Sequence, residues 1–333
     1  MLYLKVNFVD NVTPEFPPVA IVGPTSVGKT KIGILAANAL GGEIVNADSM
    51  QVYRGMDIGT AKPTRIEQTQ AVFHLIDVVN PDESWSVSDF QTKSAALSLS
   101  LHRSGVLPIF VGGTGLYIRA VTTVLQIPSA TPNNVIRKQW SEFAAEHGNL
   151  ALHSAAAQRD KAGADKIHIN DQHRLIRLIE VFEQTGQKLS ELHQKNAEMA
   201  GECGAIVIGL NYLDRRQLYD RINTRVDTMM QNGFLEEVEA LLTAGCRPEF
   251  NSFQSLGYRQ LASVVRGEML LSDAVDRIKC ETRHFARRQL VWFRADKNVK
   301  WINVDGMSEA NVAHEVISVL QRNLGIRRNT SAQ

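Results

Sequence analysis

The chain has 333 residues, of which 44% are hydrophobic, and its formal net charge is +1. A chain of this length and apolar content can bury a large core, which we expect to be divided between two lobes. No apolar run approaches the roughly 18 residues that a membrane span requires, so we expect no membrane association. The net charge favours no particular partner, and a nucleic-acid surface would have to be a local basic patch.

The cysteines and the first residues of the chain both indicate a cytoplasmic protein. Cys203, Cys246 and Cys280 are far apart and odd in number, with neither zinc-ligand spacing nor a disulfide framework. Residues 1–18 lack the basic-then-apolar design of a secretory signal. We therefore expect the reducing cytoplasm as the location and interpret residues 1–18 as an N-terminal extension.

One short motif predicts a phosphate-binding loop of the pattern G-x-x-x-x-G-K-[ST]. Its residues are Gly23, Pro24, Thr25, Ser26, Val27, Gly28, Lys29 and Thr30. We expect a buried strand, Val19–Val22, before the loop and a helix, Lys31–Leu40, after it. In that setting the loop N–H groups and the helix N-terminus converge where negative charge is stabilised. Lys29 would reach the terminal phosphate oxygens, and the Thr30 hydroxyl would hold Mg²⁺.

Residues 19 to about 125 alternate strands and helices, which is the pattern of a parallel sheet covered on both faces. Further strands are expected at Glu43–Asn46, Phe73–Val78, Val106–Val111 and, after a stretch that is only helical, Ala205–Leu210. We therefore predict an α/β fold: a P-loop NTPase-like parallel sheet core with helices on both faces and a small all-helical insertion domain.

The predicted domain limits follow from this alternation. They are an extension over 1–18, a discontinuous core over 19–127 and 204–315, a helical insertion over 128–203, and a helix end with a polar tail over 316–333. Two long helices, Arg215–Ala244 and Asp273–Arg294, are expected to pack on the sheet of the first lobe.

Two strand ends carry candidate chemistry. Asp48 follows the strand that ends at Asn46, and ligands of parallel sheets bind at the C-terminal ends of strands. Its carboxylate suits a general base or a magnesium-associated group, the alternative being a cap on the next turn. A later strand runs into Gly112–Gly115, where glycines would let a ligand approach the backbone and Thr114 adds a hydroxyl. A plain tight turn is the alternative for that segment.

Basic residues form a second group of candidates. The helix Asp273–Arg294 combines basic and aromatic side chains, which suits an RNA backbone and unstacked bases. Its basic residues are Arg277, Lys279, Arg283, Arg287, Arg288 and Arg294. A solvated helix face over core aromatics is the alternative.

Two arginine pairs leave both interpretations open. Arg221 and Arg225 lie four apart on one helix face and either serve the site or are solvated. In the insertion, Arg174 and Arg177 are three apart and either contact RNA or form a salt bridge with Glu180.

Four further stretches, together with the phosphate loop, carry a family resemblance. They are Asn46–Pro63, with the sequence NADSMQVYRGMDIGTAKP, then Gly112–Tyr117, Gly257–Gln260 and Arg287–Phe293. In this order, over about residues 19–302, they closely resemble the bacterial tRNA dimethylallyltransferases.

The resemblance implies a reaction and its participants. A dimethylallyl group would pass from dimethylallyl diphosphate to N6 of the adenosine 3′ of a tRNA anticodon, and the phosphate loop would bind the prenyl diphosphate. It implies a general base at Asp48 and a diphosphate-binding arginine at Arg225, with Thr114 beside the active site. The implied tRNA contacts are Asp48, Ser49, Met50, Gln51, Thr114, Arg137, His173, Arg174, Arg177, Gln254, Gly257, Tyr258, Arg259, Arg287, Arg288, Gln289 and Arg294. The expected partners are the tRNA anticodon stem-loop and the prenyl diphosphate, with Mg²⁺ as cofactor and no obligate protein partner, so that the protein is a monomer.

Two other classes of function keep part of this pattern. An adenylate prenyltransferase or a small-molecule P-loop kinase would retain the loop and Asp48, but neither needs the helical insertion or the basic helix. A non-catalytic RNA-binding protein would not need the complete loop together with Asp48.

Overall fold

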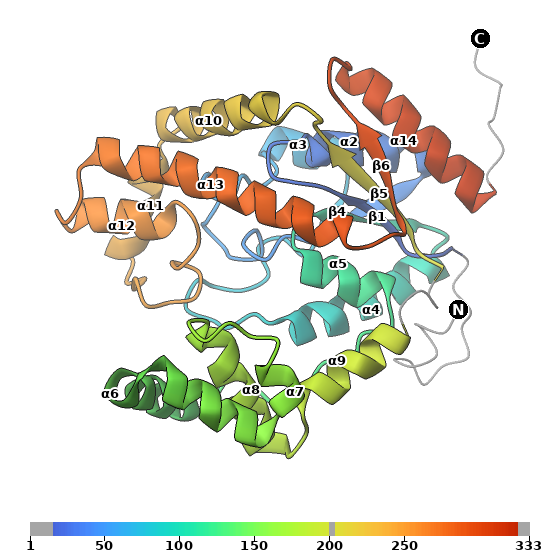
Figure 1. The fold of residues 1–333 in the computed structure, drawn as a ribbon. Helices are drawn as coiled ribbons and strands as arrows, with labels where there is room; N and C mark the ends of the chain where they lie inside the picture. The colour runs from blue at the N-terminus through green and yellow to red at the C-terminus, as the bar shows by residue number, and fades with distance from the viewer. Residues whose placement is uncertain (1–15, 200–203, 326–333) are drawn as a thin grey trace, which may run out of the picture. The chain divides into compact units, whose positions relative to one another are not determined.

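The computed structural model describes residues 16–199 and 204–325 (Figure 1). Most of the expected N-terminal extension, Cys203 and most of the polar tail lie outside these residues. The chain divides into two compact units, one made of residues up to Thr123 and from Gly201 onward, the other of Val124–Ala200. Within the described ranges, no helix is both long enough and apolar enough to cross a membrane.

The first unit is built on a six-stranded parallel sheet in the order β3-β2-β4-β1-β5-β6. The strands are β1 (Val19–Val22), β2 (Gly42–Asn46), β3 (Phe73–His74), β4 (Leu107–Gly112), β5 (Ile206–Asn211) and β6 (Val299–Asn303). Val19 of β1 lies opposite Ile109 on one side and Ile206 on the other. The sheet is therefore complete only when the segments before and after the helical unit meet. The predicted parallel α/β fold is confirmed.

Alternate side chains of the strands face two separate cores. Ile21, Ile109 and Ile208 pack in the core that contains α2 (Lys29–Leu40) and α14 (Glu309–Leu324). Ala20, Val45 and Phe110 pack in the core on the other face. That second core contains side chains of α4 (Val87–Arg103), α5 (Gly115–Thr122) and α13 (Leu271–Arg294). Burial on both faces explains why these strands read as nearly continuous apolar runs.

A third core lies beside the sheet and includes the loop after β2. Val52, Tyr53 and Met56 of this loop pack with Phe234 and Tyr258. The helices around them are α10 (Arg215–Gln231), α11 (Phe234–Thr243), α12 (Tyr258–Val265) and α13, and a short α3 (Arg65–Gln70) follows the loop. Segments far apart in sequence thus meet next to the C-terminal end of β2.

The second unit is entirely helical within its described residues. Its helices are α6 (Asn134–Arg159), α7 (Lys161–Ala164), α8 (Gln172–Thr185) and α9 (Leu189–Glu198). Trp140, Leu152, Leu175 and Leu178 are among its core residues. The Asp171 side chain caps α8 by accepting from Arg174 N, and the left-handed Gly186 ends the helix.

The structure corrects several predicted elements. The strand Phe73–Val78 stops after His74, because Leu75 and Asp77 have φ values of 59° and 54° that extended backbone does not allow. The single helix over 215–244 is two helices, since Gly233 with φ 92° interrupts it. Strand β6 was not predicted.

Two domain limits also differ from those expected. The division at 315/316 cuts α14, whose Val312, Val316 and Leu320 belong to the main core. The helical unit spans Val124–Ala200, where the sequence indicated 128–203.

Candidate active site

The phosphate loop joins β1 to α2 and leaves backbone donors available. Helix α2 starts after Gly28, which is left-handed, and no side chain caps the helix. The first N–H groups of the helix therefore lack intrahelical acceptors and can bind an anion. The N–H of Thr25, by contrast, already donates to Oε1 of Gln289 at 2.8 Å.

Two desolvated cations adjoin this loop without a carboxylate partner. Nζ of Lys29 donates to the Pro24 carbonyl at 2.7 Å. Burial and the neighbouring Arg225 lower the pKa of Lys29 to about 7, although Asp48 acts in the opposite direction. Burial also lowers the pKa of Arg225, and its guanidinium has no hydrogen bond or ion pair with another described residue. Cations held in this state favour an anionic ligand.

Arg221, one turn before Arg225 on α10, has a different task. Its Nε donates to the Ser26 carbonyl at 3.1 Å, so it supports the loop from outside. Ser26 has φ 65°, an uncommon value for a residue with a side chain. Arg221 is thus exposed to solvent and at the same time bonded to the loop, so both interpretations hold in part for this residue.

Asp48 belongs to the segment that follows β2 and lies near the phosphate loop. Its Oδ1 accepts from Met50 N at 2.9 Å, which is the local turn contact that the alternative interpretation foresaw. The carboxylate nevertheless lies close enough to Lys29 and Arg225 to raise their pKa values. The turn contact and a role in the site thus coexist, because a carboxylate has a second oxygen.

Thr114 connects the ends of two neighbouring strands. Its Oγ1 accepts from Ser49 N at 3.0 Å, and its own N–H donates to the Ala47 carbonyl at 3.2 Å. The hydroxyl therefore fixes the backbone next to Asp48.

One cavity of about 1160 Å³ joins these groups. Lys29, Thr30, Asp48, Gln51 and Arg225 line it. Apolar side chains also line it, namely Ile58, Val111, Met229 and Phe285. A cavity with a cationic end, one carboxylate and apolar walls can hold a diphosphate carrying a short hydrocarbon.

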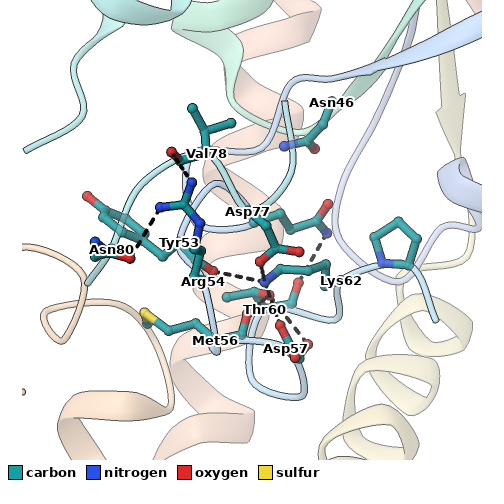
Figure 2. Close-up of polar contacts among 12 residues, drawn as sticks. Asn46, Tyr53, Arg54, Met56, Asp57, Thr60, Lys62, Asp77, Val78 and Asn80 are labelled. Atoms are coloured by element: carbon teal, nitrogen blue, oxygen red, sulfur yellow. Dashed lines mark hydrogen bonds and ion pairs between the residues drawn. The ribbon is translucent and has the colours of Figure 1, made fainter. Parts of the chain in front are cut away.

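Another part of the cavity wall is a polar network around Lys62. Figure 2 shows the Lys62 ammonium between Asp57 and Asp77, with Tyr53 beside it. The Arg54 guanidinium adds bonds to the Val78 carbonyl at 2.9 Å and to Oδ1 of Asn80 at 3.2 Å. This network joins the loop after β2 to the segment after β3.

The glycines after β4 make room for protein side chains. A Cβ atom on Gly113 would lie 2.1 Å from Nε2 of Gln289, and one on Gly115 would lie 2.2 Å from Trp292. Helix α13 therefore packs directly on this turn. At Gly113 and Gly115 the expectation that a ligand approaches the backbone is replaced by a packing role.

Five of the predicted tRNA contacts make contacts inside the protein instead. They are Gly257, Tyr258, Gln289, Arg137 and Arg177. Tyr258 is fully buried, and its hydroxyl donates to Oε1 of Glu237 at 2.6 Å. Burial and Glu237 raise the pKa of Tyr258 well above its usual value. Gly257 is buried against Phe234. Neither residue faces solvent, and the contacts described for both are internal.

Gln289 is also internal. It is 6% exposed, and Nε2 donates to the Gly113 carbonyl at 2.9 Å while Oε1 accepts from Thr25 N. Both ends of its amide thus bind backbone of the site, and the side chain is almost fully enclosed.

In the helical unit, Arg137 and Arg177 converge on a buried glutamate. Arg137 Nε lies 2.8 Å from Glu180 Oε1, and Arg177 NH1 lies 2.5 Å from Glu180 Oε2. Burial alone would raise the pKa of Glu180, but the hydrogen bonds from Arg137, Asn133 N and Arg177 outweigh it, so the pKa is lowered. The salt-bridge interpretation of Arg177 is confirmed. Arg174 is exposed and pairs with Asp171 instead.

Seven other predicted contacts are exposed. They are His173, Arg174, Gln254, Arg259, Arg287, Arg288 and Arg294. On α13 the first three basic residues are engaged, Arg277 with Glu281, Lys279 with Asp227 and Arg283 with Asn223. The exposed basic residues of α13 without such a partner are therefore those of its C-terminal half, Arg287, Arg288 and Arg294. Of the aromatic residues of this helix, Phe293 belongs to the core.

Sequence reasoning missed one central residue, Glu237 of α11. Its carboxylate accepts from the backbone N–H groups of Asp57, Ile58 and Gly59 at 2.9, 2.8 and 3.2 Å. Nothing in the local pattern distinguishes Glu237 from the neighbouring acids of α11, because its backbone partners lie about 180 residues away in sequence.

Comparison with known proteins adds the family. The chain matches the IPP transferase family over residues 51–296 and the isopentenyl transferase family over residues 18–77. The tRNA dimethylallyltransferase of Syntrophobacter fumaroxidans is 45% identical over 289 residues, which cover 87% of this chain and 84% of that protein. That of Bacillus cereus is 40% identical over 93% of this chain and 96% of its own.

Solved structures agree with this assignment. The tRNA isopentenylpyrophosphate transferase of Bacillus halodurans superposes with a TM-score of 0.69 at 38% identity, covering 93% of this chain and 97% of that one. A eukaryotic dimethylallyltransferase acting on tRNA shares the fold, with a TM-score of 0.78 at 24% identity. On these grounds, the chain belongs to the IPP transferase family and is an enzyme of the tRNA dimethylallyltransferase type.

Proposed function

We propose that the cavity transfers a dimethylallyl group from dimethylallyl diphosphate to N6 of the adenosine 3′ of a tRNA anticodon. The products are N6-(dimethylallyl)adenosine and diphosphate. One observation carries the proposal: Lys29 and Arg225, two cations that form no ion pair, line the same cavity as the Asp48 carboxylate. Such a cavity offers charge for a leaving diphosphate and a base for the acceptor.

The chemistry assigns a role to each group. The bond between the prenyl carbon and the diphosphate oxygen breaks as the bond from N6 forms, and the diphosphate leaves with the electron pair. The lone pair of N6 is delocalised into the adenine ring, so N6 is a weak nucleophile. We assign to Asp48 the acceptance of the N6 proton, a contribution of ~10²–10⁴-fold for a positioned general base. Lys29, Arg225 and the loop N–H groups stabilise the charge that develops on the diphosphate.

The oxygen donors of the cavity fit Mg²⁺. Thr30 and Asp48 supply one hydroxyl and one carboxylate, and Mg²⁺ usually takes its other ligands from phosphates and water. Among the described residues, no group of three His, Cys, Asp or Glu side chains could hold a metal by itself. We therefore assign Thr30 as a ligand of an ion that arrives with the diphosphate and neutralises part of its charge.

We assign the RNA surface to the exposed basic residues. Arg287, Arg288 and Arg294 of α13 are exposed and have no ion pair with another described residue. Guanidinium groups in this state suit backbone phosphates. His173 and Arg174 of the helical unit are further exposed candidates. We propose that the protein acts as a monomer in the cytoplasm.

A labelling experiment tests the function. The protein is incubated with labelled dimethylallyl diphosphate and unmodified tRNA, and the RNA is digested and its nucleosides identified. Label on the adenosine 3′ of the anticodon supports the proposal. Label on AMP but not on an anticodon stem-loop would establish an adenylate prenyltransferase, and stoichiometric ATP consumption would establish a kinase.

A further inference from the structure

Lys62 is another lysine that lines the cavity, and its surroundings differ from those of Lys29. Its side chain is 3% exposed. Nζ donates to the Tyr53 carbonyl at 2.8 Å, to Asp57 Oδ1 at 2.5 Å and to Asp77 Oδ1 at 2.6 Å (Figure 2). An ammonium has three donors, so this group is saturated. It has no proton left for a ligand, and its role must lie in what it holds together.

The segments that Lys62 joins meet at Gln51. The Gln51 carbonyl accepts from Asp77 N at 3.2 Å. Its side-chain Nε2 donates to the carbonyls of Thr60 and Ala61 at 3.2 and 3.1 Å. Residues directly before Lys62 therefore hold the Gln51 amide, and a residue bonded to Lys62 holds the Gln51 backbone. Gln51 itself lines the cavity, three residues after Asp48.

The backbone around Lys62 is strained. Ala61, Leu75 and Asp77 have φ values of 48°, 59° and 54°, and they are three of the four described residues other than glycine with positive φ. The fourth, Ser26, belongs to the phosphate loop. Such conformations persist only where surrounding contacts enforce them, and they cluster at functional sites. A buried ammonium that bridges two carboxylates is a contact of this kind.

We propose that Lys62 is a positioning residue for the acceptor base. It fixes the Ala61 and Asp77 segments, these fix Gln51, and Gln51 holds the adenine so that N6 lies between Asp48 and the prenyl carbon. This inference rests on the proposed function. It adds that one saturated ammonium, which does not touch the substrate, fixes the part of the cavity wall that receives the acceptor base. We call this part, formed by Gln51, Ala61, Lys62 and Asp77, the acceptor wall.

The test compares Lys62→Met with a matched control, Lys161→Met. Lys161 pairs with Asp165 at 2.9 Å on the surface of the helical unit, so the control also removes one lysine–aspartate pair. With an anticodon stem-loop, Lys62→Met should lower kcat by ~10²-fold, as expected for a misplaced substrate. Its affinity for inorganic diphosphate should equal that of the wild type, because the phosphate loop is separate. The control should match the wild type in both measurements.

A second readout reports seating of the base without any reaction. A stem-loop carrying 2-aminopurine 3′ of the anticodon should fluoresce more strongly on binding, because a base that enters a pocket leaves its stack. Wild type and Lys161→Met should show this increase, and Lys62→Met should lose it at saturating RNA. A purely structural role would lower the melting temperature and leave the increase and kcat of the folded protein unchanged, which would overturn the inference.

If Lys62→Met does not fold, Asp77→Asn keeps the test decisive. The amide preserves the shape of the side chain and weakens only one of the two charged contacts. A loss of the fluorescence increase with normal diphosphate binding supports the inference, and wild-type behaviour refutes it. A wild-type protein that neither seats nor modifies the base would instead refute the proposed function.

Discussion

Lys29 and Lys62, two of the lysines that line the cavity, show two ways of using a desolvated ammonium. Lys29 has only a carbonyl partner, and its pKa is lowered to about 7. Lys62 bridges two carboxylates and a carbonyl. The end of the cavity that binds the prenyl donor, formed by the phosphate loop with Lys29 and Arg225, therefore has unpaired positive charge until an anion binds. We call it the donor end. In the acceptor wall, by contrast, the charges are already paired in the free protein. The difference separates groups that bind from groups that position.

Asp48 lies between these two regions, and its replacement should have the largest effect. Asp48→Asn should lower kcat by ~10²-fold or more, because an amide cannot accept the N6 proton. Binding of tRNA should persist, since the exposed arginines are unchanged. Single-turnover rates and a tRNA binding curve measure the two effects. Asp165→Asn, a change on the surface of the helical unit, is the control, and an Asp48→Asn rate within a few-fold of wild type would refute the assignment.

The pH dependence of diphosphate binding probes the incomplete end. In the free protein Lys29 loses its proton around pH 7. A bound diphosphate favours the charged ammonium and raises that pKa, so binding takes up a proton above pH 7. Affinity for inorganic diphosphate should therefore fall with rising pH, by at most ~10-fold per pH unit.

Lys29→Arg provides the matched control for this effect. Its guanidinium does not titrate in this range, while the titration of diphosphate itself is the same for both proteins. The difference between the two calorimetric pH profiles isolates Lys29. Identical profiles would mean that Lys29 is charged in the free protein.

Gln289→Met should separate the loop from the RNA surface. The change leaves Thr25 N and the Gly113 carbonyl without their partner, a loss of about 1–3 kcal/mol for buried groups. The KM for the prenyl donor should rise several-fold, while tRNA binding and its salt dependence stay the same. Arg288→Met on the same helix should do the reverse. An effect of Gln289→Met on tRNA alone would return this residue to the RNA surface.

The smallest expected effect concerns the basic end of α13. Arg287→Ala with Arg288→Ala should weaken tRNA binding and reduce its log–log salt slope by roughly 0.7 for each lost contact to single-stranded RNA. Diphosphate affinity should not change. Titrations at several salt concentrations, with a melting curve, measure this. An unchanged slope with a lowered melting temperature would assign these arginines to the scaffold.

Sequence reasoning recovered the donor end better than the acceptor wall, for a physical reason. The phosphate loop acts through a local backbone conformation, so a strand, eight residues and a helix are enough to predict it. Asp48 followed from the rule that ligands bind at strand ends. The backbone partners of Glu237 and Gln289 lie at least 176 residues away in sequence, a separation that no local spacing encodes.

The secondary structure shows the same difference between features that the local sequence determines and features that tertiary contacts determine. Strand β1 was predicted with its observed limits because it is buried on both faces, whereas β6 alternates exposed and buried residues and was missed. Tyr258 and Gln289 were expected on the RNA surface because the family motif does not distinguish exposed from buried positions. Only the packing of α12 and α13 reveals which of their residues face inward.

The contact between Glu237 and the backbone of Asp57–Gly59 has a consequence for folding. It closes a loop of about 180 residues, which includes the entire helical unit. Loop closure of this length is entropically costly, and contacts of large sequence separation form slowly. The phosphate loop also receives bonds from the C-terminal half of the chain, from Gln289 and Arg221, and Arg225 lines the same cavity. In a nascent chain, therefore, neither the diphosphate site nor the acceptor wall would be complete before that half has been made.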